Sequence, residues 1–95
     1  MDAARLDAER VRAEWAARGF SCELWVDGPG QRSIDFVHDV DELVMVLEGE
    51  IELSFLERTL RPQPGEEVLI PAHAHHDVVN VGGSVARWLF GYQRS

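Results

Sequence analysis

Lysine is absent from this chain of 95 residues, and all nine of its basic residues are arginine. Schiff-base catalysis and the attachment of pyridoxal phosphate both need a lysine amine. A phosphate-binding loop of the GxxxxGK type needs one as well. The sequence therefore excludes these three classes of site.

Cysteine and long apolar runs are also scarce. Cys22 is the single cysteine and cannot form an internal disulfide, and its apolar neighbours in FSCELWV indicate a small core or strand residue. No segment approaches the roughly 20 apolar residues that span a bilayer. The charged N-terminus lacks the apolar region of a signal peptide. We therefore expect a cytoplasmic protein.

Positive charge is in the minority, because 17 acidic residues outweigh the nine basic ones and give a net charge of -8. The negative net charge repels the phosphate backbones of nucleic acids and the surfaces of anionic membranes. Neither nucleic acid nor a membrane is therefore expected as a partner. A length of 95 residues, 45% of them hydrophobic, allows one small folded domain with a thin core.

Residues 1–19 predict an N-terminal helix, which we place at 3–18. Asp2 can cap its start, and Gly19 ends it. The apolar side chains recur on one face at helical spacing: Ala4, Ala8, Val11 and Trp15.

Residues 20–95 predict an all-β domain, because short apolar segments alternate there with turn signals. Strands are expected at 20–26, 32–37, 42–48, 50–56, 59–61, 67–70, 76–81 and 85–92. So many short strands in one small domain indicate a β-barrel or jelly roll.

The segment ELVMVLE at 42–48 is apolar on both faces, whereas a strand with one face in water should alternate. Leu43, Met45 and Leu47 therefore need cover on the face opposite Val44 and Val46. The N-terminal helix could supply this cover, or a second chain could. Because a short chain also has a thin core, we expect a homodimer.

Two ionisable side chains are predicted to point into the barrel. The two-residue period of strands places Glu42 on the face of Val44 and His76 on the face of Val78. His38 precedes Glu42 by four residues, close enough to converge on the same point. A carboxylate in a small core is costly unless it is paired or ligates a cation. Two imidazoles and a carboxylate are a usual ligand set for iron, manganese, nickel or zinc.

Interpretations without a metal also account for these residues. His76 could be a core histidine hydrogen-bonded to Glu42, and His38 could be a loop residue beside Asp39 and Asp41. Glu42 and His38 could also form an acid–base pair, since the pKa of a partly buried carboxylate beside an imidazole is open to tuning.

The spacing of these residues resembles the two motifs of the cupin family. In the first motif a His-x-His pair precedes a Glu, and a Gly follows that Glu after six residues. His38, Glu42 and Gly49 fit this spacing. The second motif runs Gly, five residues, Pro-x-Gly, two residues, His, three residues and Asn. Its matches are Gly65, Pro71, His76 and Asn80. The resemblance implies a small single-domain cupin, a double-stranded β-helix or jelly-roll barrel.

The chain departs from the family pattern at two positions. Phe36 replaces the first histidine of the pair, and His73 replaces the glycine of Pro-x-Gly. By resemblance, the four family ligands reduce here to His38, Glu42 and His76, which would hold a divalent iron, manganese, nickel or zinc ion. His73 is a further candidate ligand, because it precedes the strand of His76 in the same turn.

The remaining polar and aromatic residues have simpler expected roles. Strand parity places His75 on the face opposite His76, and Asn80 is expected to form hydrogen bonds at a strand end. Six aromatic side chains could line an apolar pocket: Trp25, Phe36, Phe55, Trp88, Phe90 and Tyr92.

We therefore expect a small metal-binding cupin-like protein that binds a small polar organic ligand in its barrel. The sequence leaves open whether it is an enzyme; a metal-dependent oxygenase or isomerase is the activity considered. Two alternatives stay open. One is a non-catalytic module that binds a metal or a small molecule. The other is a degenerate cupin with a structural or interaction role, in which Phe36 marks the loss of the site.

Overall fold

The computed structural model describes residues 8–94, apart from the side chains of residues 34 and 35. One helix and eight strands follow one another: α1 (Ala8–Ala17), β1 (Glu23–Asp27), β2 (Arg32–Phe36), β3 (Glu42–Glu48), β4 (Ile51–Phe55), β5 (Arg58–Leu60), β6 (Glu67–Ile70), β7 (His76–Asn80) and β8 (Ala86–Tyr92). Every predicted strand is present. The predicted helix start at residue 3, with Asp2 and Ala4, lies outside the described residues.

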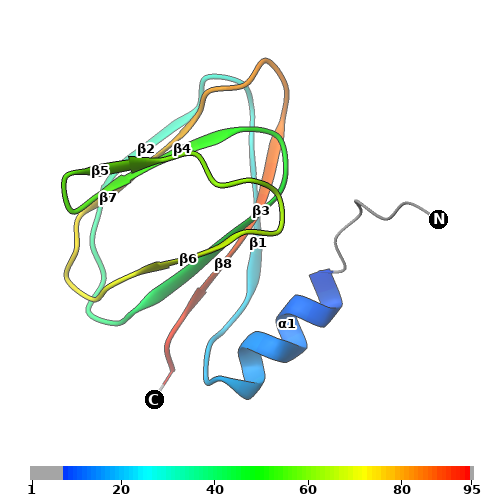
Figure 1. Ribbon diagram of the computed structural model, residues 1–95, viewed down its shortest axis with the longest axis vertical. Coiled ribbons are helices and arrows are strands. Elements are labelled where there is room, and N and C mark those ends of the chain that lie inside the picture. Colours follow the sequence, from blue (N-terminus) through cyan, green and yellow to red (C-terminus); the bar gives the residue numbers. More distant parts are fainter. Residues whose placement is uncertain (1–7, 95) are drawn as a thin grey trace.

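The strands form two antiparallel sheets of four, ordered β1-β8-β3-β6 and β2-β7-β4-β5. Figure 1 shows them as two facing layers. The main core lies between them and includes Val44 and Val46 of β3, Leu53 of β4 and Val78 of β7. The predicted all-β, jelly-roll type barrel with an N-terminal helix is therefore confirmed.

The helix covers the outer face of the β1-β8-β3-β6 sheet (Figure 1). A second core forms there from Trp15, Phe20, Leu43, Met45 and Leu89. The helix thus covers the outward face of β3, which was expected to need cover from the helix or from a second chain. A homodimer is not required for this purpose and stays a prediction.

Polar contacts fix the end of the helix to the edge of this sheet. The indole N–H of Trp15 donates to Oε1 of Glu67 at 3.0 Å, and Arg18 donates to both Glu67 oxygens at 2.8 and 2.9 Å. The hydrogen bond from Arg18 lowers the pKa of Glu67. Gly19, with a φ of +88°, ends the helix as predicted. In the described part of the chain, no helix is long and apolar enough to cross a membrane.

Gly91 of β8 lies beneath the helix, where the backbone leaves no room for a side chain. A methyl group at this position would overlap the carbonyl oxygen of Ser21 and lie 3.0 Å from the Trp15 ring. Gly91→Ala should therefore lower the free energy of unfolding by about 1–3 kcal/mol. Urea denaturation at fixed pH measures this change.

The matched control is Gly83→Ala, since a methyl group at position 83 meets nothing within 4 Å. Its free energy of unfolding should stay within about 0.5 kcal/mol of the unchanged protein. Equal stabilities of the two variants would contradict the close packing of β8 against the helix.

Candidate metal centre

Two cross-strand pairs face each other between the sheets. On one sheet Glu42 of β3 is directly opposite Tyr92 of β8, and on the other His76 of β7 is opposite Phe36 of β2. Directly opposed residues of an antiparallel pair have side chains side by side on the same face. All four side chains line one pocket. The strand register thus gathers residues that are far apart in the sequence.

His38 joins these residues from the connection between β2 and β3. The backbone N–H of His73 donates to the His38 carbonyl at 2.7 Å. Asp41, three residues further on, accepts from the N–H of Ala72 through Oδ1 and from the N–H of Gln93 through its carbonyl, both at 2.9 Å. The loop that carries His38 is therefore tied to the turn before β7 and to the end of β8.

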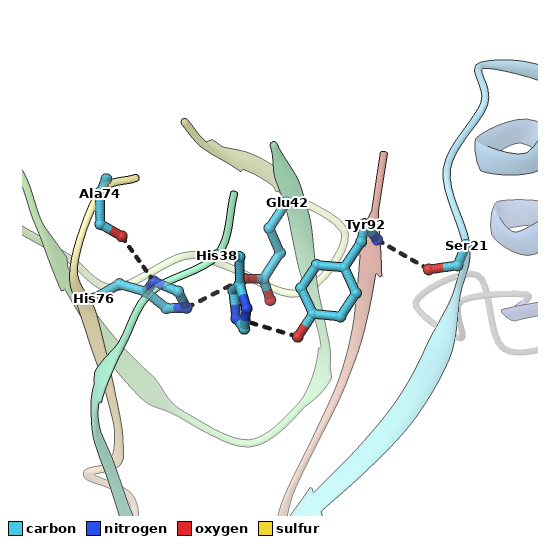
Figure 2. Close-up of polar contacts among 6 residues, drawn as sticks. All are labelled: Ser21, His38, Glu42, Ala74, His76 and Tyr92. Carbon is cyan, nitrogen blue, oxygen red and sulfur yellow. Dashed lines mark hydrogen bonds and ion pairs between the residues drawn. The ribbon is translucent and has the colours of Figure 1, made fainter. Parts of the chain in front are cut away.

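The three predicted ligand residues come together at one carboxylate oxygen. Nε2 of His76 lies 3.1 Å from Oε1 of Glu42, and Nε2 of His38 lies 3.6 Å from the same atom (Figure 2). The three candidate ligand atoms all lie within 4.8 Å of one another. Glu42 and His76 are buried, with 4% and 3% of their surface exposed, and His38 is half-buried.

A backbone carbonyl sets the orientation of the His76 ring. Nδ1 of His76 lies 3.2 Å from the carbonyl oxygen of Ala74. A carbonyl only accepts, so Nδ1 carries the hydrogen of this bond. In the neutral ring Nε2 is then an acceptor that faces the Glu42 carboxylate at 3.1 Å. Two buried acceptors this close repel each other unless a proton or a metal ion lies between them.

Oε1 of Glu42 stands out by its lack of a hydrogen-bond donor. Among the described residues, it is the one buried side-chain oxygen or nitrogen without a hydrogen-bond partner. Divalent metals bind imidazole nitrogen and carboxylate oxygen at about 2.0–2.2 Å, which keeps neighbouring ligand atoms roughly 3.0–3.4 Å apart. The separations of 3.1 and 3.6 Å around Oε1 are close to this range. The three residues therefore fit a divalent metal.

The other two histidines of the 73–76 segment lie outside this cluster. The side chains of His73 and His75 are exposed. His73 has a φ of +70° in the turn before β7. Its contact with the site is made by its backbone N–H, which donates to the His38 carbonyl, and not by its imidazole. Its candidacy as a ligand gains no support from this placement. The exposure of His75 agrees with its predicted outward position.

A small open pocket, with a cavity volume of about 50 Å³, adjoins Glu42 and His76. Its apolar walls are formed by Trp25, Phe36, Val78, Trp88, Phe90 and Tyr92. Five of the six aromatic residues expected to line a pocket do so. The sixth, Phe55, packs in the main core between the sheets instead.

A fully buried carboxylate, that of Asp27, fixes two of the pocket indoles. The indole N–H groups of Trp25 and Trp88 both donate to it. The side-chain amide of Asn80 donates to the carbonyls of Asp27 and Ser84 at 3.2 and 2.9 Å. Asn80 therefore has the structural role expected for it, and Asp27 is a pocket residue that the sequence did not single out.

Sequence reasoning also missed the position of Tyr92 beside the cluster. Its hydroxyl lies 3.3 Å from Nε2 of His38 (Figure 2). Burial, together with the charges of Glu42 and Glu23, raises the pKa of Tyr92 to about 12. The two-residue period along β8 indicates that this side chain faces inward. Tyr92 reaches the cluster only because it pairs with Glu42, and the local sequence does not specify that strand register.

The protonation of His76 gives the site a pH dependence in the metal-free protein. Burial alone would lower the pKa of His76, but the contacts with Glu42 and with the Ala74 carbonyl outweigh burial and raise it above 6.5. The protonated ring therefore stabilises the fold fully below about pH 6.5. This contribution is lost as the pH rises through the higher pKa of the folded state. Glu42→Gln should lower the pKa of His76, as measured by NMR titration of its ring protons.

The matched control is Glu52→Gln, because the Glu52 carboxylate pairs with Arg61 and not with His76, and it should leave the pKa of His76 unchanged. An unchanged pKa of His76 in Glu42→Gln would show that the carboxylate does not hold the proton.

The sequence model of the family described as a cupin domain matches residues 23–92. No curated protein matches the chain. An oxalate oxidase solved with the substrate analogue glycolate is 23% identical, with a TM-score of 0.74 over 81% of this chain and 43% of that chain. A cupin superfamily protein from Desulfitobacterium hafniense is 20% identical, with a TM-score of 0.71 over 80% of this chain and 68% of that chain.

A sugar phosphate isomerase of the cupin superfamily from Silicibacter pomeroyi is 30% identical, with a TM-score of 0.70. The match covers 81% of this chain and 52% of that chain, so this chain spans about half the length of the isomerase and less than half that of the oxalate oxidase. These likenesses agree with the two-sheet barrel seen here. Because the family match extends from β1 to the end of β8, the chain belongs to the cupin family.

Proposed function

We propose that this cupin holds a divalent metal ion between His38, Glu42 and His76 and binds a small organic ligand in the adjoining aromatic pocket. The observation that carries the proposal is the buried Oε1 of Glu42, which faces two imidazole nitrogens and has no hydrogen-bond donor while His76 is neutral. A cation at this point would relieve the repulsion between these acceptors.

The donor set narrows the choice of metal. Two imidazole nitrogens and one carboxylate oxygen suit iron, manganese, nickel or zinc, whereas calcium and magnesium prefer sets made of oxygen atoms. Three protein ligands leave coordination positions open for a ligand. The pocket adjoins Glu42 and His76, so a ligand bound in it would lie next to the metal.

The pocket favours a ligand with one polar end and one apolar end. Its walls are aromatic, and the one carboxylate and the one imidazole that line it are those of Glu42 and His76. No arginine of residues 8–94 lines it, and the chain contains no lysine. A phosphate or a second carboxylate on the ligand would therefore find no arginine or lysine to pair with in the pocket. We infer a ligand with an oxygen donor at the cluster and an apolar, planar part against the rings.

The chain's own residues would orient this ligand. Asp27 fixes the indoles of Trp25 and Trp88, so that this wall has a defined shape. Glu42 and His76 can hold or release a proton next to the oxygen end of the ligand. A bound metal would supply a Lewis acid that polarises a ligand oxygen, which suits oxygenase or isomerase chemistry.

Metal binding should depend on His76 and not on its neighbour. Protein purified without chelator and then supplied with iron, manganese, nickel or zinc should bind about one ion per chain. His76→Ala should lower the affinity at least about tenfold, the loss seen even when only supporting residues of metal sites are changed. Mass spectrometry of the bound metals and competition with a coloured chelator measure both quantities.

His75→Ala is the matched control, because this exposed imidazole lies one residue away and outside the cluster. It should bind the metal as tightly as the unchanged protein does. Unaltered metal binding in His76→Ala, or none in the unchanged protein, would refute the proposed metal site.

Ligand binding should follow the apolar character of the pocket. Benzoate should quench the tryptophan fluorescence of the zinc-loaded protein, since Trp25 and Trp88 line the pocket. Trp25→Ala should weaken the binding of benzoate about tenfold, as expected from the loss of roughly 1.4 kcal/mol of ring contact. Fluorescence titration measures the dissociation constant.

Leu24→Ala is the control, because this exposed side chain is adjacent to Trp25 but does not line the pocket. Glucose 6-phosphate is the competing probe, and it should bind more weakly than benzoate. Tighter binding of the sugar phosphate would overturn the inferred ligand class and leave the metal site intact.

A further inference from the structure

The cluster is one ligand short of the family set, because Phe36 occupies the position of the first motif histidine. The Phe36 ring centroid lies 5.6 Å from that of His76 and 6.1 Å from that of His38. The ring is therefore beside the cluster, but it has no lone pair to offer a metal. Any fourth protein ligand must come from another element.

Tyr92 places an oxygen at the cluster from the opposite sheet. It is the cross-strand partner of Glu42, so the two side chains lie side by side on the inner face. Its hydroxyl is 3.3 Å from Nε2 of His38, and the two ring centroids are 4.6 Å apart. Figure 2 shows the phenol pointing toward the imidazole beside the Glu42 carboxylate. The distance of 3.3 Å falls within the roughly 3.0–3.4 Å expected between neighbouring ligands of one ion.

Backbone contacts hold the phenol in this place. The N–H of Tyr92 donates to Oγ of Ser21 at 2.9 Å, and the N–H of Ser21 donates to the carbonyl of Tyr92 at 3.0 Å. The next residue, Gln93, donates to the carbonyl of Asp41 in the loop that carries His38. The end of β8 and the His38 loop are thus fixed relative to each other.

We propose that the phenol oxygen of Tyr92 is the fourth protein ligand of the metal, in place of the histidine that Phe36 has replaced. This inference rests on the proposed function. In the metal-free protein, the phenol hydrogen can point to the Nε2 lone pair of His38. With a metal bound, the phenol would give up this proton to water or buffer, and Tyr92 and His38 would hold the ion through the phenolate oxygen and Nε2. The positive charge of the ion favours the phenolate, whereas the Glu42 carboxylate disfavours it.

Ferric iron gives a direct test, because phenolate coordinated to it produces a visible charge-transfer band and phenolate vibrations in the resonance Raman spectrum. Tyr92 is the only tyrosine of the chain, so these signals can have no other source within the protein. The full chain is stripped of metal, loaded with one equivalent of Fe(II) without oxygen and oxidised to Fe(III). Bound iron is then measured by mass spectrometry.

The unchanged protein should retain iron and show both spectroscopic signals. Tyr92→Phe, which removes only the hydroxyl, should lose both signals and bind iron at least about tenfold more weakly. Bound iron without the signals in the unchanged protein would overturn the inference and leave the proposed metal site standing. Failure of the unchanged protein to retain iron would overturn both. The spectrum of the unchanged protein decides the question even if Tyr92→Phe folds poorly.

Discussion

The Glu42 carboxylate and the His76 imidazole lie 3.1 Å apart in a buried space. Glu42 begins β3 and pairs with Ile70 on one side and with Tyr92 on the other. His76 lies between Phe36 and Phe55 in the other sheet. Strand pairing on both flanks therefore fixes the backbone of each residue, and burial restricts the side chains. The sheets thus impose a contact that only a proton or a metal ion can make favourable.

A raised pKa of His76 and affinity for a metal are two consequences of this one constraint. In the metal-free protein, the Glu42 carboxylate stabilises a proton on Nε2 and so raises the pKa of the ring. A divalent ion competes with that proton for the same lone pair, because only neutral imidazole binds metals. The bond from Nδ1 to the Ala74 carbonyl serves both states, since it keeps Nε2 directed at the carboxylate.

Features that follow from local patterns could be predicted from the sequence. Strand alternation places Glu42 and His76 inward, because each lies an even number of residues from a core valine of its own strand. The two-sided apolar pattern of β3 correctly indicates a second covered face, and the helix supplies the cover. The fit of His38, Glu42 and His76 to the family spacing identifies the three residues that converge in space.

Features that depend on register or on backbone conformation could not be predicted in this way. Tyr92 meets Glu42 because β8 pairs with β3 across 50 positions of sequence, and no local pattern specifies that pairing. His73 fits the spacing of a nearby ligand, yet its left-handed backbone conformation leaves the imidazole exposed. The role of Asp27 arises from two indoles on different strands.

The helix and the site are joined through the last residues of β8. Successive residues of a strand point to opposite faces, so Gly91 lies against Trp15 on the outside while Tyr92 reaches His38 on the inside. Ser21, which follows the helix, is bonded to the backbone of Tyr92 in both directions. Any shift of the helix on the sheet would therefore move the strand end that positions the phenol. The outer core of this small cupin is for that reason part of the support of its site.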